Sequence, residues 1–361
     1  MCRLIVDTGA LARNLEKLRG FTSARIIAVV KGNGYGLGLV PFSRLLLAQG
    51  VDMLAVSSAA EAAALRDAGI TAEVLMLSST ADPGEIAALL DRDVILTVGS
   101  CDAARAVSAA AAAQGITARV HIKLDTGMGR YGFLPQETAS AAALLRTLPA
   151  LGVEGVFTHF ANAANERQTA LQYRRFTEGV RALRDGGIHT GMCHVCASTA
   201  FLRYPALHLD AVRLGSVLLG RLSVPDTLAL ERIGWLETRI SELKTLPAGW
   251  RVGYLGTYRT KRETRLALLP VGYACGIGVT EASNARRLRE RLHRLLSAGR
   301  EVLRTDSLTV LVNGRRCLVR GVAGATQIEA DVTDVPCAVG DTVRIEVRPK
   351  FVDSAVPREY R

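Results

Sequence analysis

The chain has 361 residues, of which 49% are hydrophobic and only 5% aromatic, and its formal net charge is +11. A chain of this length can bury a large core in one or two domains, and the scarcity of aromatic residues argues against a surface on which nucleic-acid bases stack. The excess of basic residues favours small anionic ligands over nucleic acid. No apolar segment reaches the ~20 residues needed to span a bilayer, so no membrane partner is expected. The seven cysteines show no disulfide spacing, which predicts a cytoplasmic protein.

The residues from 8 to 226 alternate short β-branched runs with Ala- and Leu-rich helical patterns. Eight runs have the composition of strands, at 24–30, 52–57, 73–78, 93–98, 118–124, 152–158, 192–197 and 209–215. Helical patterns lie between them, and one opens with the start signal Asp82-Pro83. Eight strands alternating with helices predict an α/β fold, a (β/α)8 TIM-type barrel, with a doubly wound open sheet as the alternative.

The pattern changes to short strands separated by Gly and Asp turns in residues 227–361, which predicts a mainly-β C-terminal domain. Asn313-Gly314 lies between two apolar runs and predicts a hairpin. The first strand, within residues 1–7, could join this domain. Residues 284–298 form a basic helical pattern with leucines on one face, interpreted as an inserted helix packed on its own domain, with a partner or membrane-surface role as the minority alternative.

Polar side chains follow the predicted barrel strands where each strand ends, and these ends share one rim of a barrel. They are Lys31, Lys123, Asp125, Arg130, His159, Ser198 and Arg213. A desolvated lysine has a lowered pKa and can form a Schiff base with an aldehyde, and glycine amides and a serine can cradle a phosphate. Together these groups predict a pyridoxal 5'-phosphate site. No metal is expected, because the close pair Cys193 and Cys196 has no supporting ligands and is interpreted as packing.

Six motifs resemble those of the alanine racemase family, in the family's order and over almost the whole chain. They are "AVVKGNGYGLG", "HIKLDTGMGRYGF", "THFANA", "LHLDAVRLGSVLLG", "LPVGYACG" and "VLVNGRRCLVRG". The resemblance implies the two-domain fold, pyridoxal 5'-phosphate as cofactor, an amino-acid substrate, and a head-to-tail homodimer with shared active sites.

The resemblance also implies a role for each matching residue. Lys31 would hold the cofactor and act as one base, and Tyr273 of the partner subunit would act as the other. The phosphate would be bound by Tyr35, Ser198, Gly215 and Ser216. Arg130 would contact the cofactor's phenolic oxygen and the substrate carboxylate, and Ala325 would lie where a family methionine holds that carboxylate through its amide.

Three further matches imply electrostatic roles. Arg213 would contact the pyridine nitrogen, His159 would tune Arg213 and Tyr273, and Lys123 matches a lysine that is carbamylated in many members. Two bases on opposite faces suit racemisation, and an arginine beside the ring nitrogen does not readily give up its proton, which favours a racemase over a decarboxylase. A pyridoxal phosphate carrier, or a decarboxylase or other lyase of the same fold, are the alternatives.

Several departures from the family lie at the predicted substrate pocket. Ala197, Cys275 and Ser354 stand where the family has asparagine, aspartate and tyrosine, and Ala325 stands for methionine. Since wall residues are smaller here, we expect the substrate to be alanine, or serine or a larger amino acid.

Overall fold

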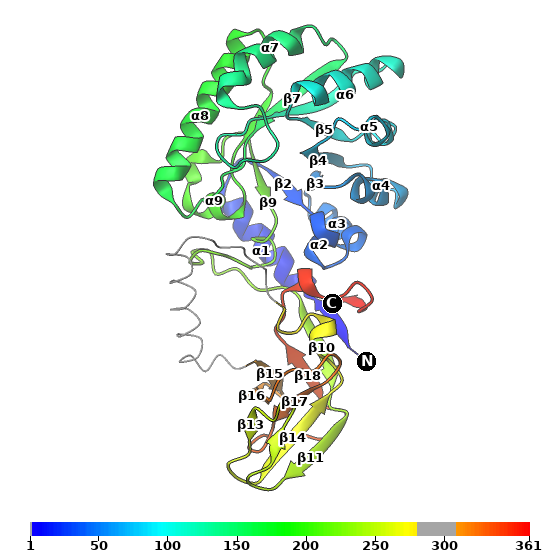
Figure 1. Ribbon diagram of the computed structural model, residues 1–361, viewed down its shortest axis with the longest axis vertical. Coiled ribbons are helices and arrows are strands. Elements are labelled where there is room, and N and C mark those ends of the chain that lie inside the picture. The colour runs from blue at the N-terminus through cyan, green and yellow to red at the C-terminus, as the bar shows by residue number, and fades with distance from the viewer. Residues whose placement is uncertain (1, 280–307) are drawn as a thin grey trace. The chain divides into compact units, whose positions relative to one another are not determined.

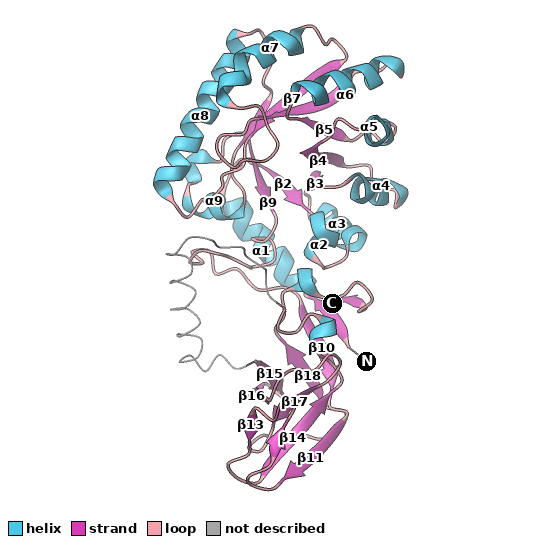
Figure 2. Ribbon diagram, in the orientation of Figure 1, coloured by secondary structure: helices cyan, strands magenta, loops and turns pink. Residues whose placement is uncertain are grey.

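The computed structural model describes residues 2–279 and 308–361. The predicted helix 284–298 lies outside these residues. The chain divides into two compact units, one formed by residues 8–233 and the other by residues 1–7 together with 234–361. Figure 2 shows that the first unit combines helices and strands, whereas the second is almost entirely strands and loops.

A parallel sheet of eight strands forms the centre of the first unit, within the residues described. Its strands are β2 (Arg25–Val29), β3 (Met53–Val56), β4 (Glu73–Ser79), β5 (Ile95–Val98), β6 (Ala118–Lys123), β7 (Leu151–Phe157), β8 (Met192–His194) and β9 (Ala211–Leu214). The order is β8-β7-β6-β5-β4-β3-β2-β9, and a single bridge between Ala197 and Arg213 closes the ring. The predicted (β/α)8 barrel is therefore confirmed.

Helices alternate with the strands, the first of them preceding β2, and most lie around the outside of the ring (Figure 1). They are α1 (Thr8–Phe21), α2 (Lys31–Tyr35), α3 (Leu39–Ala48), α4 (Ala59–Asp67), α5 (Pro83–Leu90), α6 (Cys101–Ala113), α7 (Thr138–Arg146), α8 (Glu166–Asp185) and α9 (Ser198–Arg203). Four of them begin at a side chain that accepts a backbone N–H of the first turn, from Ser58, Asp82, Ser100 and Asn165. Such caps satisfy donors that a helix start leaves unpaired and so fix where each helix begins.

Side chains at alternate strand positions fill the barrel, because successive residues of a strand point to opposite faces. Ile27 and Val29 of β2 meet Met53 and Ala55 of β3 in one buried cluster. Buried on both faces, these strands read as continuous apolar runs, which is typical of parallel sheets.

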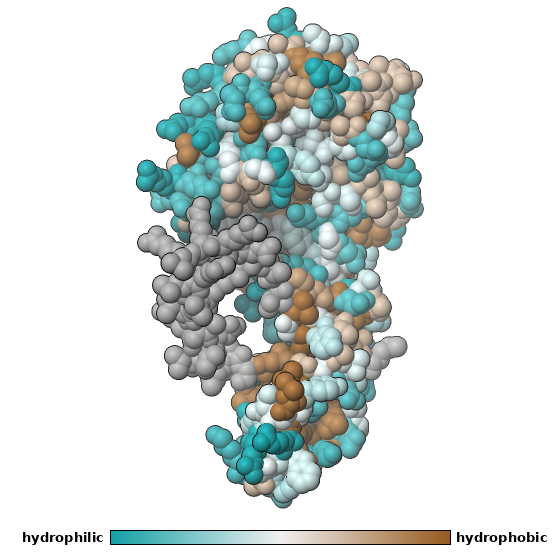
Figure 3. Space-filling model, viewed as in Figure 1, coloured by the Kyte–Doolittle hydropathy of each residue, from teal (hydrophilic) through white to brown (hydrophobic). Residues whose placement is uncertain are grey.

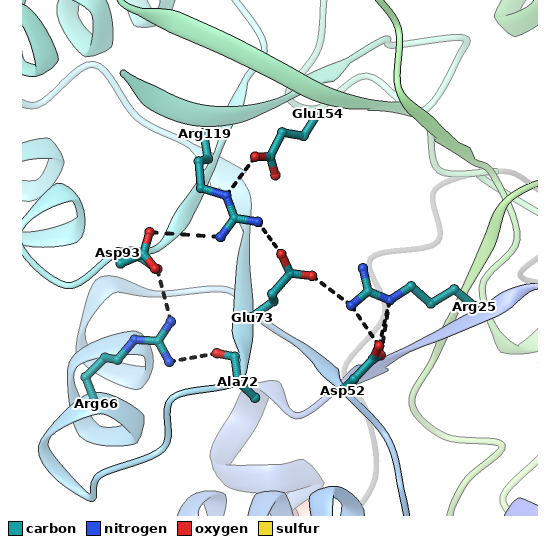
Figure 4. Close-up of polar contacts among 8 residues, drawn as sticks. All are labelled: Arg25, Asp52, Arg66, Ala72, Glu73, Asp93, Arg119 and Glu154. Carbon is teal, nitrogen blue, oxygen red and sulfur yellow. Dashed lines mark hydrogen bonds and ion pairs between the residues drawn. The ribbon is translucent and has the colours of Figure 1, made fainter. Parts of the chain in front are cut away.

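A network of ion pairs lies near the amino ends of the barrel strands (Figure 4). Arg25 lies 2.9 Å from Asp52 and 2.7 Å from Glu73, measured between nitrogen and oxygen atoms. Arg119 also bonds Glu73, and its Nε lies 2.7 Å from Glu154. Residues of β2, β4, β6 and β7, and Asp52 just before β3, are thus connected by charge at this end, which in barrels of this kind serves stability.

The second unit is built on a sheet of nine strands among the described residues, ordered β11-β14-β17-β16-β15-β18-β10-β1-β19. Their bounds are β1 (Arg3–Val6), β10 (Trp235–Arg239), β11 (Glu242–Leu246), β14 (Thr264–Leu269), β15 (Thr309–Val312), β16 (Arg315–Arg320), β17 (Ile328–Asp331), β18 (Thr342–Ile345) and β19 (Arg358–Tyr360). A small separate pair is formed by β12 (Arg251–Val252) and β13 (Tyr258–Arg259).

Two local features of this unit bear on the sequence. The first strand, β1, pairs antiparallel with β10 and parallel with β19, so it is an inner strand of this sheet. The predicted hairpin is confirmed: β15 and β16 pair around Asn313 and Gly314, whose φ angles are 49° and 76°. In neither unit does any described helix have the length and apolar character that crossing a bilayer requires.

Candidate active site

A cavity of about 340 Å³ lies at the carboxyl ends of the barrel strands. The structure brings to it most of the barrel residues predicted from the sequence, namely Lys31, Tyr35, Lys123, Arg130, His159, Ser198, Arg213 and Gly215. They come from the segments after β2, β6, β7, β8 and β9 or from the ends of strands, since Lys123 is the last residue of β6 and Arg213 the last but one of β9. Ser216 follows Gly215 in the turn after β9.

Lys31 stands at the start of a left-handed turn. Gly32, Asn33, Gly34 and Tyr35 have φ angles of 64°, 55°, 63° and 52°, close to the values of a left-handed helix. Each non-glycine residue in this conformation costs roughly 1–2 kcal/mol of conformational free energy. The two glycines avoid this cost and so lower the free energy of the turn. The chain thus leaves β2 with its lysine directed to the cavity and its backbone close beside it.

The charge of Lys31 is disfavoured by its surroundings. Burial lowers the pKa of its amine, the cation of Arg130 lowers it further, and Glu61 opposes both. A lowered pKa leaves more of the amine neutral and nucleophilic near neutral pH. The amine is therefore suited to react with an aldehyde.

Lys123 is only 4% exposed and faces the same cavity. Burial lowers the pKa of its amine to about 7, with Arg130 and Arg213 adding to the shift. Its Nζ lies over two aromatic rings, 5.4 Å from the centroid of Tyr131 and 5.2 Å from that of Phe157. The amine itself makes no hydrogen bond or ion pair with any residue that the structure describes. Its lowered pKa makes the neutral form of this second amine more available near neutral pH.

The loop that carries Arg130 is held by one carboxylate. The side chain of Asp125 accepts the backbone N–H groups of Gly127, Met128, Gly129 and Arg130, at 2.8–3.2 Å. Burial raises the pKa of Asp125, but these four donors outweigh burial and lower it. The carboxylate of Asp125 is therefore used to hold the loop by hydrogen bonds. Arg130 is exposed and lines the cavity.

Arg213 is 2% exposed, and its partners are neutral groups. Its terminal nitrogens donate to the carbonyls of Thr158 and His194 at 2.6 and 2.9 Å and approach Nδ1 of His159 at 3.4 Å. Burial lowers the pKa of Arg213 to about 10, so it remains a cation at neutral pH. Burial and then Arg213 lower the pKa of His159 to about 3, so this imidazole is neutral.

Two histidines that the sequence interpretation left without a role lie behind Arg213. Nδ1 of His194 is 2.6 Å from a terminal nitrogen of Arg213, and Nε2 of His194 is 2.9 Å from Nδ1 of His121. Because Arg213 can only donate, His194 carries its proton on Nε2 and donates it to His121. Burial lowers the pKa of both imidazoles, that of His121 to about 4. Strand alternation offered a signal, since His121 and Lys123 lie on the same face of β6.

Tyr35, Ser198 and Gly215 form a second side of the cavity. A Cβ atom at Gly215 would lie 2.3 Å from the phenolic oxygen of Tyr35, so only glycine lets the two approach. The hydroxyl of Ser198 accepts the N–H groups of Gly215 and Val217, both at 3.3 Å. Hydroxyl and amide donors are thus gathered at one end of a cavity that otherwise carries cations, and this donor set fits a phosphate.

Tyr273 and Ala325 lie in the second unit, side by side. The N–H of Tyr273 donates to the carbonyl of Gly324 at 3.1 Å, and that of Ala274 to the carbonyl of Ala325 at 3.0 Å. A Cβ at Gly272 would lie 2.1 Å from the oxygen of Gly324, so the close approach of the two loops requires this glycine. The ring of Tyr273 lies on a 3-10 turn and the residue is 57% exposed.

Of the residues where the sequence departs from the family, Ala197 lines the barrel cavity, whereas Cys275 and Ser354 belong to the second unit. The pair Cys193 and Cys196 is buried, and the thiol of Cys196 donates to the carbonyl of Leu207 at 3.2 Å. Sequence interpretation missed other lining residues, among them Ser57, Ser78, Tyr131 and Phe157. The two serines end strands just as the predicted residues do, which was an available signal.

Comparisons with known proteins agree over the whole length. The model of the family "Alanine racemase, N-terminal domain" matches residues 6–223, and that of "Alanine racemase, C-terminal domain" matches 233–349. The alanine racemase of Methanococcus maripaludis is 34% identical over 346 residues, covering 93% of this chain and 88% of that protein. That of Desulfovibrio desulfuricans is 35% identical over 346 residues, covering 94% and 87%.

Two solved structures are similarly close. The alanine racemase of the D-cycloserine producer Streptomyces lavendulae superposes with a TM-score of 0.85 at 28% identity, covering 100% of this chain and 97% of that one. The Bacillus anthracis enzyme with bound L-Ala-P gives a TM-score of 0.81 at 29% identity, covering 100% and 95%. Fold, cavity and these relatives together show that this chain belongs to the alanine racemase family and is a racemase, an isomerase of amino acids.

Proposed function

We propose that the chain interconverts L- and D-amino acids with pyridoxal 5'-phosphate, using Lys31 and Tyr273 as two bases. The observation that carries this proposal is that Lys31 and Arg213 line one cavity, and that Arg213 pairs with no carboxylate among the residues described. A reactive amine suits the aldehyde of the cofactor. A buried arginine that keeps its proton suits a pyridine nitrogen that is to stay unprotonated.

The residues present fit the cofactor. Lys31 would hold its aldehyde carbon, and the donors of Tyr35, Ser198, Gly215 and Ser216 would hold its phosphate. Arg213 would meet its ring nitrogen and Arg130 its phenolic oxygen. When bound, the cofactor supplies a ring that withdraws electrons from the substrate Cα.

The chain's own groups then move the protons. Nζ of Lys31 takes or gives a proton on one face of the substrate Cα, and the phenolic oxygen of Tyr273 does so on the other. Arg130 binds the substrate carboxylate and fixes which bond faces each base. His159, kept neutral by burial and by Arg213, accepts from Arg213 through Nδ1 and so presents N–H at Nε2.

Lys123 would act as a carbamate rather than as an amine. Carbon dioxide reacts only with a neutral amine, and the pKa of about 7 makes that form abundant. The amine nitrogen would form a bond to the carbon of carbon dioxide and release one proton to solvent, which leaves a negative charge beside Arg130. The new carboxylate would thus supply an acidic partner for Arg130, which forms no ion pair in the described part of the chain, where Asp125 is occupied by backbone N–H groups.

The second base would come from a second copy of the chain in a homodimer. Tyr273 is largely exposed, and so are other apolar side chains of the same unit: Tyr254 is 70% exposed, Leu255 89% and Val322 44%. Tyr254 and Val322 form a backbone bridge, so these side chains gather in one place. Figure 3 shows hydrophobic side chains at the surface of this unit. A gathering of this kind is typical of a surface that a partner covers.

For the substrate we propose alanine, with serine or a larger amino acid also admitted. Alanine is supported by the family and by the names of the relatives, and the B. anthracis structure holds L-Ala-P. The wider range is supported by the small residues Ala197, Ala325 and Ser354 at positions where the family carries larger ones.

The test is exchange of the α-proton in deuterated water after reconstitution with pyridoxal 5'-phosphate, over a panel of single-enantiomer amino acids followed by chiral chromatography. Exchange with inversion on alanine is the expected result, and turnover of serine would support the wider pocket. Bound cofactor without exchange would favour the carrier alternative. Loss of the substrate carboxyl group as carbon dioxide would favour the decarboxylase.

A further inference from the structure

Glu61 lies at the third residue of α4 and makes contacts that its helix does not require. Its helix begins at Ser58, whose hydroxyl accepts the N–H of Glu61 at 3.3 Å. In a capping box, the acidic side chain at this third position accepts the backbone N–H of the N-cap residue, which here is Ser58. Here Oε2 of Glu61 instead accepts the N–H of Ser57 at 3.0 Å and lies 3.4 Å from its hydroxyl.

The other carboxylate oxygen reaches the lysine loop after β2. Oε1 of Glu61 accepts the N–H of Gly32 at 2.5 Å and lies 3.4 Å from the nitrogen of Asn33. These are the first two amides after Lys31, where the chain turns into the left-handed conformation. One side chain on α4 therefore ties the loop after β2 to the end of β3.

From these contacts we infer that Glu61 is a positioning residue for Lys31. It does not line the cavity, although Lys31 and Ser57 both do. It acts through the backbone: by holding the N–H of Gly32, it fixes the direction in which the preceding residue projects its amine. Because a small misplacement of a reacting group can cost about a hundredfold in rate, this hold has a direct effect on chemistry.

The charge of Glu61 acts in the same place. The groups facing Lys31 are otherwise basic or neutral: Arg130 from the loop after β6, Lys123 at the end of β6 and His159 after β7. Glu61 is the acidic group that raises the pKa of Lys31 against burial and Arg130. Removing it should lower that pKa further.

The inference rests on the proposed role of Lys31, and its test separates the two. Apoenzyme is incubated with pyridoxal 5'-phosphate over a range of pH, the product is trapped with borohydride, and label on the Lys31 peptide is counted by mass spectrometry. Label on the wild-type chain at a residue other than Lys31 would overturn the proposed function. Label at Lys31 that is insensitive to Glu61 would overturn only this inference.

Glu85 offers a matched control. It occupies the same third position of α5, its N–H is accepted by the capping residue Asp82 at 2.7 Å, and its carboxylate bonds no residue among those described. We expect Glu61→Ala to slow labelling of Lys31 about tenfold at a pH above the midpoint, where the amine is neutral in both proteins, and to move the pH midpoint of labelling downward. Glu85→Ala should behave as the wild type in both respects.

Glu61→Gln separates the effect of the Glu61 hydrogen bonds from the effect of its negative charge. The amide retains one acceptor oxygen, so the labelling rate should lie between those of the wild type and Glu61→Ala, while the pH midpoint should fall as in Glu61→Ala. If Glu61→Ala does not fold, Glu61→Gln carries the test alone. With the loaded enzyme, we expect kcat to fall with little change in KM for alanine. Wild-type rate and midpoint in both Glu61 variants would refute the inference.

Discussion

At the amino ends of the barrel strands basic side chains meet carboxylates, whereas at the carboxyl ends they face an open cavity. Arg25 and Arg119 share Glu73 and each has a further acidic partner. At the opposite end, Lys123 and Arg213 are buried without an ion pair to any described carboxylate, and the pKa of each is lowered, mainly by burial.

The difference shows how one fold separates stability from chemistry. Ion pairs at the amino ends connect strands of the barrel, and because these charges neutralise one another they attract a ligand only weakly. The cations at the other end lie near one another and form no ion pair among the described residues, which is unfavourable for folding. They give the cavity a positive potential that an anionic ligand can neutralise. The four predictions below test this contrast, from the largest expected effect to the smallest.

Replacing Tyr273 by Phe should reduce racemisation of both alanine enantiomers about a thousandfold, within the range expected for loss of a general acid or base. Chiral chromatography of each reaction direction measures it. Tyr254→Phe is the control, because it removes another exposed phenol of the same unit. A Tyr273→Phe variant with half of the wild-type rate would exclude the two-base mechanism.

Replacing Lys123 by Ala should lower kcat/KM about a hundredfold, because Arg130 loses the carbamate that orients it. With a pKa of about 7, the neutral amine becomes more abundant as pH rises. Enzyme freed of carbon dioxide should therefore recover more fully when bicarbonate is added above that pKa than below it. Carbon-13 NMR with labelled bicarbonate should show one carbamate signal that Lys123→Ala lacks. A signal that persists in this variant would place the carbamate elsewhere.

Restoring bulk with Ala325→Met should lower the ratio of serine to alanine turnover about tenfold, the usual scale for a change of this size in a pocket wall. Competition between the two amino acids, read by chiral chromatography, gives the ratio. Thr326→Met adds a similar side chain at the adjacent exposed position and should leave the ratio unchanged. An unaltered ratio in Ala325→Met would remove this residue from the substrate pocket.

Glu73→Gln should leave kcat unchanged and cost about 1 kcal/mol of unfolding free energy at neutral pH, since the network is partly exposed. Burial raises the pKa of Glu73, but hydrogen bonds from Arg119 and Arg25 outweigh burial and lower it. The stabilisation is therefore present above the unfolded pKa of about 4.3 and is lost as pH falls through the lower, folded value.

Urea unfolding of Glu73→Gln and the wild type over this range should show the two curves converging in acid. Asp102→Asn, which breaks an exposed pair with Arg105 on α6, is the control and should change little. A fall in kcat for Glu73→Gln would mean that the two ends of the barrel are not separate in function.

Much of the barrel could be predicted from the sequence because its signals are local. Each strand is a short apolar run, and helices such as α4 and α5 open with a capping residue. The residues that end strands, including Lys31 and His159, could be assigned to one rim for the same reason.

What could not be predicted depends on contacts between distant segments. His121 and His194 lie 73 residues apart and meet only because β6 and β8 flank β7. The hold of Glu61 on Gly32 spans 29 residues and reads in the sequence as an ordinary helix start. The order of strands in the second unit is likewise set by pairing that short β patterns do not specify.

Arg213 has a mechanical consequence beyond its place beside a ring nitrogen. The barrel closes between β8 and β9 through the single bridge of Ala197 and Arg213, and the guanidinium donates across this seam to the carbonyls of His194 and Val195. The side chain of Arg213 therefore also stabilises the closure of the barrel, where β8 and β9 are paired by this one bridge. A substitution of Arg213 made to alter reactivity will therefore also weaken the pairing of β8 with β9. Amide hydrogen exchange at these two strands distinguishes a change in chemistry from local opening of the barrel.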